Sequence, residues 1–422
     1  MADVAALAEV ALWDRLVGAV AEETDGTITF EYDPDFRRSG LEISPLKLPL
    51  SHAGPITFPE LARVEAFAGL PGVLADALPD RFGNAIIERS FRDKGRPDAA
   101  LSPVQKLLYI GSRAIGALEF RPAIRLPART AEQESIEVAA LVAQARLVVE
   151  GRTDVALPDI MRVGASAGGA RPKAVILWNR SADTVRSGFA KPRPGDEPWI
   201  IKFDGVGELG APDSQARPYN RVEYAYSRLA RDAGVDVPET ALVEDRGLGH
   251  FLSRRFDRAG GRRLHVHSLG GLQHADYNAP GTFSYESYLR TVVALKLDYR
   301  AIEEAFRRAV FNVAAVNQDD HVKNFGFLMD DRGAWRLSPA YDLTFARGAG
   351  FTRRHQMTLG GKTDGFTRDD VLALGAAAGL RQGGAAIVDR VTAALERWPE
   401  YAEQAGVPEE HAAAVRAAFR AL

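Results

Sequence analysis

The stretch Asn317-Gln-Asp-Asp-His-Val-Lys-Asn-Phe-Gly326, followed by Ser338-Pro-Ala-Tyr-Asp342, decides how this chain is interpreted. Among apolar residues it places Asp319, Asn324 and Asp342. Phosphoryl transfer from a metal-bound nucleotide needs one carboxylate that orients a hydroxyl, and an amide and a second carboxylate that hold magnesium. A polar connection between a helix and a strand is the alternative, because Asp and Asn are common in turns. This stretch alone does not choose between the two interpretations.

The composition is that of an ordinary globular protein, with 46% hydrophobic and 26% charged residues. A length of 422 residues predicts two or three domains, and a net charge of -3 gives no global reason to expect nucleic-acid binding. Because there is no cysteine, disulfides, thiolate metal sites and Cys nucleophiles are excluded. No apolar run approaches the ~20 residues of a membrane helix, and the first residues lack the basic region of a signal peptide. We therefore expect a soluble, cytoplasmic protein that does not contact a membrane.

Hydrophobic periodicity predicts a mixed first half. The expected strands are 10–13, 26–32, 116–120, 174–178, 199–203, 239–243 and 249–256, and the expected helices are 60–67, 72–91 (interrupted at Pro79), 103–110 and 135–149. Residues 180–198 are rich in Pro, Gly and charge, and are predicted to form a long hairpin loop. After a turn at 257–261 the pattern becomes mainly helical. The expected helices there are 285–295, 300–315, 368–378, 384–397 and 409–422.

A small, glycine-rich segment, residues 162–173, leads into the strand 174–178. It matches neither of the two standard phosphate-loop patterns, but its glycines would let backbone N–H groups approach a phosphate closely. A flexible entry into a hairpin explains this segment equally well.

Lys202 is a single lysine in an otherwise apolar strand, on the same face as Ile200 and Asp204. A buried lysine is costly unless it is paired, and the next helix offers Glu223. That helix is predicted to be capped by Asn220 and to stop at Gly234, with an apolar stripe at Val222, Ala225, Tyr226, Leu229 and Ala230. A strand lysine paired with a helix glutamate aligns the nucleotide phosphates in kinases, whereas a strand-edge lysine that reaches solvent is the alternative.

Together these signals resemble HipA-type serine/threonine kinases, the toxins of HipBA toxin–antitoxin pairs. The matching stretches are Gly116-Ala-Leu-Glu-Phe120, Ser166-Ala-Gly-Gly-Ala-Arg-Pro-Lys173, Ile200-Ile-Lys-Phe-Asp204, Arg255-Phe-Asp-Arg258, His267-Ser-Leu-Gly-Gly-Leu272, Asp319-Asp-His-Val-Lys-Asn324 and Ser338-Pro-Ala-Tyr-Asp342. The resemblance implies an α+β, bilobal protein-kinase-like fold. Its parts would be an N-terminal module (1–125), a mixed α/β N-lobe (126–256) and a mainly α-helical C-lobe (257–422).

The resemblance also implies roles for individual residues. Asp319 would be the catalytic base, because it stands five residues before Asn324, with the adjacent Asp320 ranked second. Lys202 would contact the phosphates and be supported by Glu223. Asn324 and Asp342 would bind Mg²⁺. The nucleotide-binding residues would be Gly168, Gly169, Ala170, Arg171, Pro172, Lys173, Lys202, Arg254, Arg255, Phe256, His321, Val322, Lys323, Asn324, Tyr341 and Asp342.

In this family a serine of the glycine-rich loop is autophosphorylated, and Ser166 takes that position. Phosphate there would add roughly -2 charge near the nucleotide phosphates and could inactivate the protein. The sequence departs from the family pattern at Arg171-Pro172, where a polar-acidic pair is more familiar, and at Arg254, where some relatives carry an acid.

The expected activity is therefore transfer of the γ-phosphate of ATP·Mg²⁺ to a protein serine or threonine, with an aminoacyl-tRNA synthetase as the implied target. The expected partner is a HipB-like helix-turn-helix antitoxin, through which DNA would be contacted indirectly, and a homodimer could exist within that complex. Two other functions stay open. One is a nucleotide-binding co-repressor that acts mainly through the antitoxin. The other is a metal-dependent phosphohydrolase that uses Asp319, Asp320, His321 and Asp342.

Overall fold

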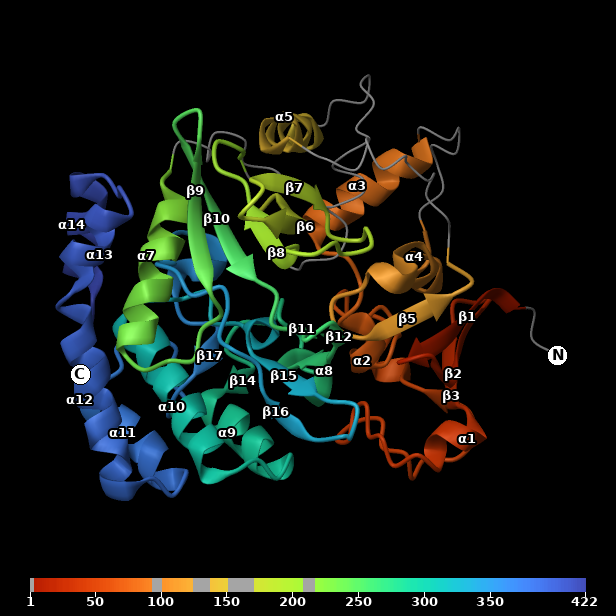
Figure 1. Cartoon of the computed structure of the whole chain (residues 1–422). Coiled ribbons are helices and arrows are strands. Elements are labelled where there is room, and N and C mark those ends of the chain that lie inside the picture. The colour runs from red at the N-terminus through yellow and green to blue at the C-terminus, as the bar shows by residue number, and fades with distance from the viewer. Residues whose placement is uncertain (1–3, 93–100, 124–136, 151–170, 208–216) are drawn as a thin grey trace. The chain divides into compact units, whose positions relative to one another are not determined.

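The structure, a computed structural model, describes residues 4–92, 101–123, 137–150, 171–207 and 217–422 (Figure 1). The chain divides into two compact units. Unit 1 comprises Met1–Glu42, Leu50–Asn220 and Glu239–His265, and unit 2 comprises Ile43–Pro49, Arg221–Pro238 and Val266–Leu422. Unit 1 thus contains most of the first two predicted domains, 1–125 and 126–256. The boundaries at 125 and 256 stay predictions.

Unit 1 begins with a five-stranded antiparallel sheet in the order β4-β3-β2-β1-β5. Its strands are β1 (Val4–Leu12), β2 (Arg15–Glu23), β3 (Ile28–Tyr32), β4 (Ile56–Thr57) and β5 (Leu118–Arg121). Trp13 and Asp14 connect β1 to β2 with positive φ angles of 49° and 62°, as a two-residue hairpin turn requires. Three short helices accompany the sheet: α1 (Pro34–Arg37), α2 (Gly72–Ala75) and α4 (Pro103–Ile110). Ser102 caps α4, and it forms a reciprocal capping box with Gln105.

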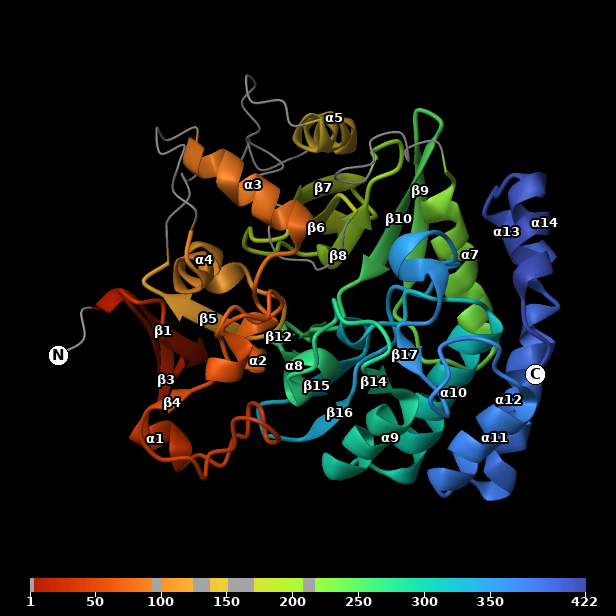
Figure 2. The ribbon, with the colours of Figure 1, turned by 180° about the vertical axis from the view of Figure 1, so that it is seen from behind.

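The second sheet of unit 1 has the order β7-β6-β8-β10-β9 and carries Lys202. Its strands are β6 (Lys173–Asn179), β7 (Thr184–Ser187), β8 (Glu197–Lys202), β9 (Thr240–Asp245) and β10 (Leu248–Arg254). Side chains alternate between its two faces. Ala174, Ile176, Trp199 and Ile201 belong to a buried core that also includes residues of α3 (Arg81–Arg92) and α5 (Val138–Val149). Figures 1 and 2 show both helices beside this sheet. The two lysines of β6 and β8 therefore lie on the opposite face.

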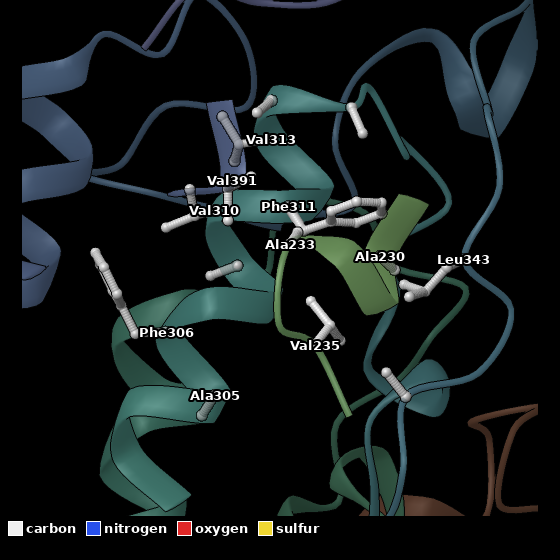
Figure 3. Packing of buried hydrophobic residues seen from close by; sticks show 14 of the residues in the cluster. Ala230, Ala233, Val235, Ala305, Phe306, Val310, Phe311, Val313, Leu343 and Val391 are labelled. Carbon is white, nitrogen blue, oxygen red and sulfur yellow. The ribbon is translucent and has the colours of Figure 1, made fainter. Parts of the chain in front are cut away.

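Unit 2 is mainly helical. Its helices are most of α7 (Tyr219–Asp232), then α8 (Leu269–Gln273), α9 (Tyr285–Ala294), α10 (Tyr299–Ala314), α11 (Arg368–Ala377), α12 (Ala385–Leu395), α13 (Trp398–Gln404) and α14 (Glu409–Ala418). The apolar stripe of α10 is fully buried at Phe306, Val310 and Val313. Figure 3 shows these side chains together with Ala230 of α7, Ala233 directly after that helix, and Val391 of α12. This core fixes the end of α10, from which the polar stretch 317–324 starts.

Strands also occur in unit 2, where the sequence suggested mainly helices. The sheet β13-β15-β16 consists of His265–Ser268, Gly326–Met329 and Trp335–Leu337, and β14 (Phe283–Ser284) pairs with β17 (Met357–Thr358). Because these strands have two to four residues each, their period-2 patterns are too short to recognise. The predicted α+β class is confirmed.

Three local predictions were wrong. Residues 60–67 form only a short 3₁₀ helix, Pro59–Leu61, because the left-handed Ala68 and Gly69 turn the chain back onto Leu61. The loop 180–198 contains the edge strand β7, which its many Pro and Gly residues concealed. Asn220 does not cap α7, which begins one residue earlier; its amide instead donates to the backbone oxygen of Lys202 at 3.0 Å. Within the described residues, no helix is long and apolar enough to cross a membrane.

Candidate functional site

The stretch that follows α10 is held in place by buried hydrogen bonds. Val316 adopts a left-handed backbone with φ of 55°, which ends the helix and redirects the chain. The Asn317 amide donates to Asn312 of α10 at 3.0 Å, and the Gln318 N–H donates to the Ala346 oxygen. Asn317 and Gln318 are both buried, so the residues that come next start from a rigid support.

The two adjacent carboxylates, Asp319 and Asp320, have different environments. Asp320 is fully buried, and its oxygens accept from the Tyr285 hydroxyl (2.6 Å), the His355 ring (2.8 Å) and the Gln356 N–H (2.7 Å). The Asp319 side chain is 46% exposed, and one of its oxygens lies 3.9 Å from Nε2 of His321. Only Asp319 can therefore meet a substrate hydroxyl without a rearrangement of the core. This geometry favours Asp319 over Asp320 as the base.

Asn324 closes the loop back onto Asp319. It ends the 3₁₀ turn Val322–Asn324, which is capped by the side chain of His321. The Asn324 amide nitrogen donates to the Asp319 backbone oxygen at 2.9 Å. Because the nitrogen is used in this way, the amide oxygen is the atom that Asn324 can offer to a cation.

The hairpin β15–β16 explains how Asp342 joins this group. Asn324 stands two residues before β15 and Asp342 five residues after β16, so both lie at the open end of the hairpin. The Tyr341 hydroxyl donates to the Lys323 oxygen at 2.7 Å and fixes this end. Asp342 has a φ of 55°, a strained conformation for a residue other than glycine that is often found at functional sites.

Close packing against Tyr341 requires glycine at the start of β15. A Cβ on Gly326 would lie 2.7 Å from the Ser338 hydroxyl and 3.1 Å from the Tyr341 ring. The placement of Tyr341, and with it that of the adjacent Asp342, thus depends on glycine at position 326, the first residue of β15.

The oxygen donors at this end of the hairpin suit magnesium. The Asn324 amide oxygen and the Asp342 carboxylate are hard ligands, and Mg²⁺ commonly takes one or two protein carboxylates, with water and substrate phosphates as its other ligands. Among the described residues there is no group of three His, Cys, Asp or Glu side chains that could hold a metal by themselves. A metal here would therefore be held jointly with a nucleotide.

His321, Val322 and Lys323, also predicted to border the nucleotide, lie in the same loop. The Lys323 Nζ is 5.0 Å from the centre of the Tyr277 ring, which also contacts the His321 ring. Val322 is buried and packs beside Gly270. The loop therefore presents one cation and one imidazole, both oriented by an aromatic ring.

In unit 1 the sheet brings two lysines together. Lys173 of β6 is paired directly with Lys202 of β8, so both side chains project from one face as cross-strand neighbours. The two positive lysine side chains repel each other at this spacing, and a nearby carboxylate or phosphate offsets that repulsion. Lys173 is buried, with its Nζ 3.8 Å from a carboxylate oxygen of Asp80, and the Lys202 Nζ is 5.7 Å from the centre of the Phe251 ring. Because Asp80 already offsets charge on Lys173, Lys202 is the cation of this pair that stays the candidate for contact with a phosphate.

The neighbouring residues predicted to face the nucleotide have structural contacts. The Arg171 guanidinium stacks 3.8 Å from the centre of the Tyr219 ring, and the Pro172 oxygen accepts from the Phe203 N–H. The predicted residues Gly168, Gly169 and Ala170, and the phosphorylation candidate Ser166, lie outside the described residues.

The segment 254–256, predicted to meet adenine, uses its arginine side chains for ion pairs. Arg254 binds Glu239 at 2.9 Å and Glu197 at 3.2 Å, while the buried Arg255 forms two bonds with Asp257. Phe256, the next residue, is half-buried. The backbone N–H groups of Arg254 and Arg255 also donate, to the oxygens of Glu239 and Pro198, so adenine contacts in this segment would come from the Phe256 ring or from backbone oxygens.

Asp257 is the centre of a buried network in unit 1. It accepts from the backbone N–H of Gly116 at 2.7 Å and from Arg255 and Arg258. Burial alone would raise the pKa of Asp257, but attraction to Arg255 and Arg258 and the hydrogen bonds outweigh it and hold the pKa well below its ordinary value. Burial disfavours the charged form of Arg258 as well, and because that form is a cation its pKa falls, to about 10.

Glu223 is buried on α7 and belongs to unit 2, and its predicted ion pair with Lys202 stays a prediction. The structure thus gathers Asp319, His321, Asn324, Tyr341 and Asp342 in unit 2, and Lys173 and Lys202 in unit 1. Sequence reasoning missed the partners of the two buried charges. These are Asp80 for Lys173, and Tyr285, His355 and Gln356 for Asp320.

The chain is similar to known proteins along most of its length. Residues 8–121 match the model of the HipA N-terminal domain, and residues 165–413 match that of the HipA-like C-terminal domain. The HipA chain in the complex of Shewanella oneidensis HipA, HipB and operator DNA is 18% identical, with a TM-score of 0.68 over 97% of this chain and 94% of that one. This likeness shows the fold, and it confirms the predicted kinase-like fold class.

Two curated relatives have kinase names. A protein of Sinorhizobium fredii named "Putative kinase Y4dM" is 28% identical over 164 residues, which are 34% of this chain and 36% of the relative. A protein of Haemophilus influenzae named "Putative kinase" is 29% identical over 165 residues, 34% of this chain and 48% of the relative. The matches therefore span between a third and a half of these relatives. Since the C-terminal domain model covers more than half of the chain and the N-terminal model precedes it, the chain belongs to the HipA family.

Proposed function

We propose that this protein is an ATP- and Mg²⁺-dependent kinase that phosphorylates a serine or threonine of a protein substrate. The observation that carries the proposal is the difference between the two adjacent carboxylates. Asp320 is fully used in buried hydrogen bonds, which leaves Asp319 exposed beside Asn324 and the hairpin end that bears Asp342. Family membership and the kinase names of the relatives support the same function.

Each group has a chemical role in this proposal. Asp319 orients the attacking hydroxyl and accepts its proton, and His321 borders that position. The Asn324 oxygen and the Asp342 carboxylate hold Mg²⁺, which supplies charge neutralisation for the phosphates when it is bound. Lys202 and Lys173 supply positive charge for the nucleotide, with Glu223 as the proposed partner of Lys202.

Autophosphorylation at Ser166 and toxin action belong to the same proposal. The HipA structure that shares this fold is a complex with HipB and operator DNA, which supports a helix-turn-helix antitoxin as partner and DNA contact through that partner. An aminoacyl-tRNA synthetase is the proposed target class, by family resemblance.

The buried state of Asp320 disfavours a phosphohydrolase. That function would use Asp319, Asp320, His321 and Asp342 together around a metal, and the oxygens of Asp320 are already engaged by Tyr285, His355 and Gln356. A co-repressor function needs no catalytic base. Substitution of Asp319 therefore distinguishes the two functions, because it should abolish kinase activity and leave co-repression intact.

The test is transfer of labelled γ-phosphate from ATP to the proteins of a cell lysate, followed by identification of the labelled chains. We expect labelling by the wild type and by the control Asp369→Asn, an exposed carboxylate at the start of α11, and none by Asp319→Asn. Mass spectrometry should also find phosphate on Ser166 in the first two proteins only. Antitoxin-dependent operator binding without any labelling would favour the co-repressor and contradict the proposal.

A further inference from the structure

Unit 2 contains a pocket whose lining has no role in the proposed chemistry. Its volume is about 500 Å³, and its lining residues are Pro280, Gly350, Phe351, Arg353, Arg354, His355 and Thr363. Such a volume accommodates several amino-acid side chains or a small ligand. No carboxylate is among these residues.

The pocket is positively charged and partly aromatic. Arg353 and Arg354 are both exposed, and neither forms an ion pair with any residue in the part of the chain that the structure describes. Phe351 beside them is 60% exposed, unusual for so large an apolar side chain. Two available guanidinium groups next to an exposed ring suit a carboxylate-bearing peptide, because Arg binds carboxylates through paired hydrogen bonds.

A short chain of contacts joins this pocket to the proposed base. His355, in the pocket wall, donates from Nδ1 to the Asp320 carboxylate at 2.8 Å, and the next N–H, of Gln356, donates to the other Asp320 oxygen at 2.7 Å. Asp320 directly follows Asp319. Among the described residues, the second nitrogen of His355, Nε2, has no hydrogen-bond partner, so the wall also holds a buried polar atom that is not satisfied by the chain.

These contacts limit the distance between Asp319 and the pocket. One Cα–Cα step, an aspartate side chain and one hydrogen bond set an upper limit on the order of 10 Å on the separation between the Asp319 Cα and the His355 ring in the pocket wall. An extended peptide spans that limit with about three residues.

We propose that this pocket docks an acidic segment of the protein substrate, with a carboxylate about three residues from the serine or threonine that is phosphorylated. The proposal rests on the kinase function above and adds the chemical class of the substrate. Docking acts by position, since it holds the hydroxyl near Asp319 and does not touch the reacting atoms.

The test measures binding without catalysis. Fluorescence anisotropy compares two labelled peptides, each with one serine, in which the residues three and four positions away are aspartates or asparagines. The proteins are the wild type, the double variant Arg353→Gln/Arg354→Gln, and a control double variant Arg332→Gln/Arg381→Gln that removes two exposed arginines of unit 2 outside the pocket. We expect the wild type and the control to bind the aspartate peptide about tenfold more tightly than the asparagine peptide, and the pocket variant to lose this preference.

Equal binding of both peptides by the wild type would overturn the proposal, and so would an unchanged preference in the pocket variant. A third peptide with phosphoserine in place of the aspartates separates carboxylate from phosphate recognition. Binding of the phosphoserine peptide alone would also overturn the proposal.

Failure of the proposed kinase function would give a different result from failure of the docking site. Asp319→Asn leaves the pocket intact, so it should bind the aspartate peptide as the wild type does. Selective binding without any phosphate transfer from ATP in the wild type would refute the kinase and the substrate assignment built on it, whereas transfer without selectivity would refute the docking site alone.

Discussion

At the scale of single residues, the structure separates two aspartates that look alike in sequence. Spacing to Asn324 ranked Asp319 first, and the burial of Asp320 gives a physical reason for that order. The partners of Asp320 come from positions 285 and 355–356, far from it in the chain. Without the fold, no local pattern could have revealed them.

The first prediction concerns the stability contributed by Asp320. Asp320→Ala should lower the free energy of unfolding by about 3 kcal/mol, because three buried donors, Tyr285, His355 and the Gln356 N–H, lose their acceptor. Urea denaturation measures this change. The half-exposed Asp319 provides the matched control, since Asp319→Ala should shift unfolding by no more than about 0.5 kcal/mol. Equal destabilisation by the two variants would contradict the structural role of Asp320.

At the scale of elements, the sequence predicted the helices well and the short strands poorly. The helix 300–315 is observed as α10, with its stripe buried, because its periodicity extends over four turns. The hairpin β15–β16 was not predicted, although it is the element that brings Asn324 and Asp342 to one end. Strands of three or four residues that are stabilised by tertiary pairing carry too little pattern of their own.

The second prediction tests whether this hairpin end positions Asp342. Tyr341→Phe removes the hydroxyl that donates to the Lys323 oxygen, which should loosen Asp342 and reduce the phosphate-transfer rate about tenfold while unfolding changes by about 1 kcal/mol. Steady-state kinetics with ATP measures the effect.

Tyr299→Phe is the control for this prediction. In the part of the chain that the structure describes, the hydroxyl of Tyr299, on α10, accepts a single long hydrogen bond of 3.4 Å, from the Arg381 N–H. Transfer by this control should match the wild type. If Tyr341→Phe also transfers phosphate at the wild-type rate, the hairpin end does not control the site.

At the scale of the whole molecule, one network joins segments that are distant in the chain. Asp257 and its arginines bind Gly116, which belongs to the N-terminal stretch that sequence reasoning assigned to a separate module. Both segments lie in unit 1. Sequence could identify the two motifs, but not that they contact each other.

The third prediction is a pH dependence of stability from Asp257. Its pKa is lowered in the folded protein, so the unfolded chain, with a pKa of about 3.9, binds more protons at mildly acidic pH. The stabilisation by Asp257 should be complete above about pH 5 and should be lost as the pH falls below about 4.

Urea denaturation across pH compares the wild type with Asp257→Asn. The variant should be less stable by about 3 kcal/mol at pH 7, because Arg255 and Arg258 keep buried charges without a carboxylate, and the difference should shrink toward pH 3. Asp183→Asn, an exposed carboxylate in a turn of unit 1, should show no such difference. A difference that is constant with pH would contradict the assignment.

The central claim is that Asp319 acts as the base of a phosphate transfer while Asp320 only supports the loop. The most direct test is the rate of γ-phosphate transfer at saturating ATP by the wild type and by Asp319→Asn, with unfolding measured in parallel. We expect a fall of about three orders of magnitude in rate and an unchanged free energy of unfolding. A variant that is equally stable and transfers phosphate within threefold of the wild-type rate would contradict the role of Asp319 as the base.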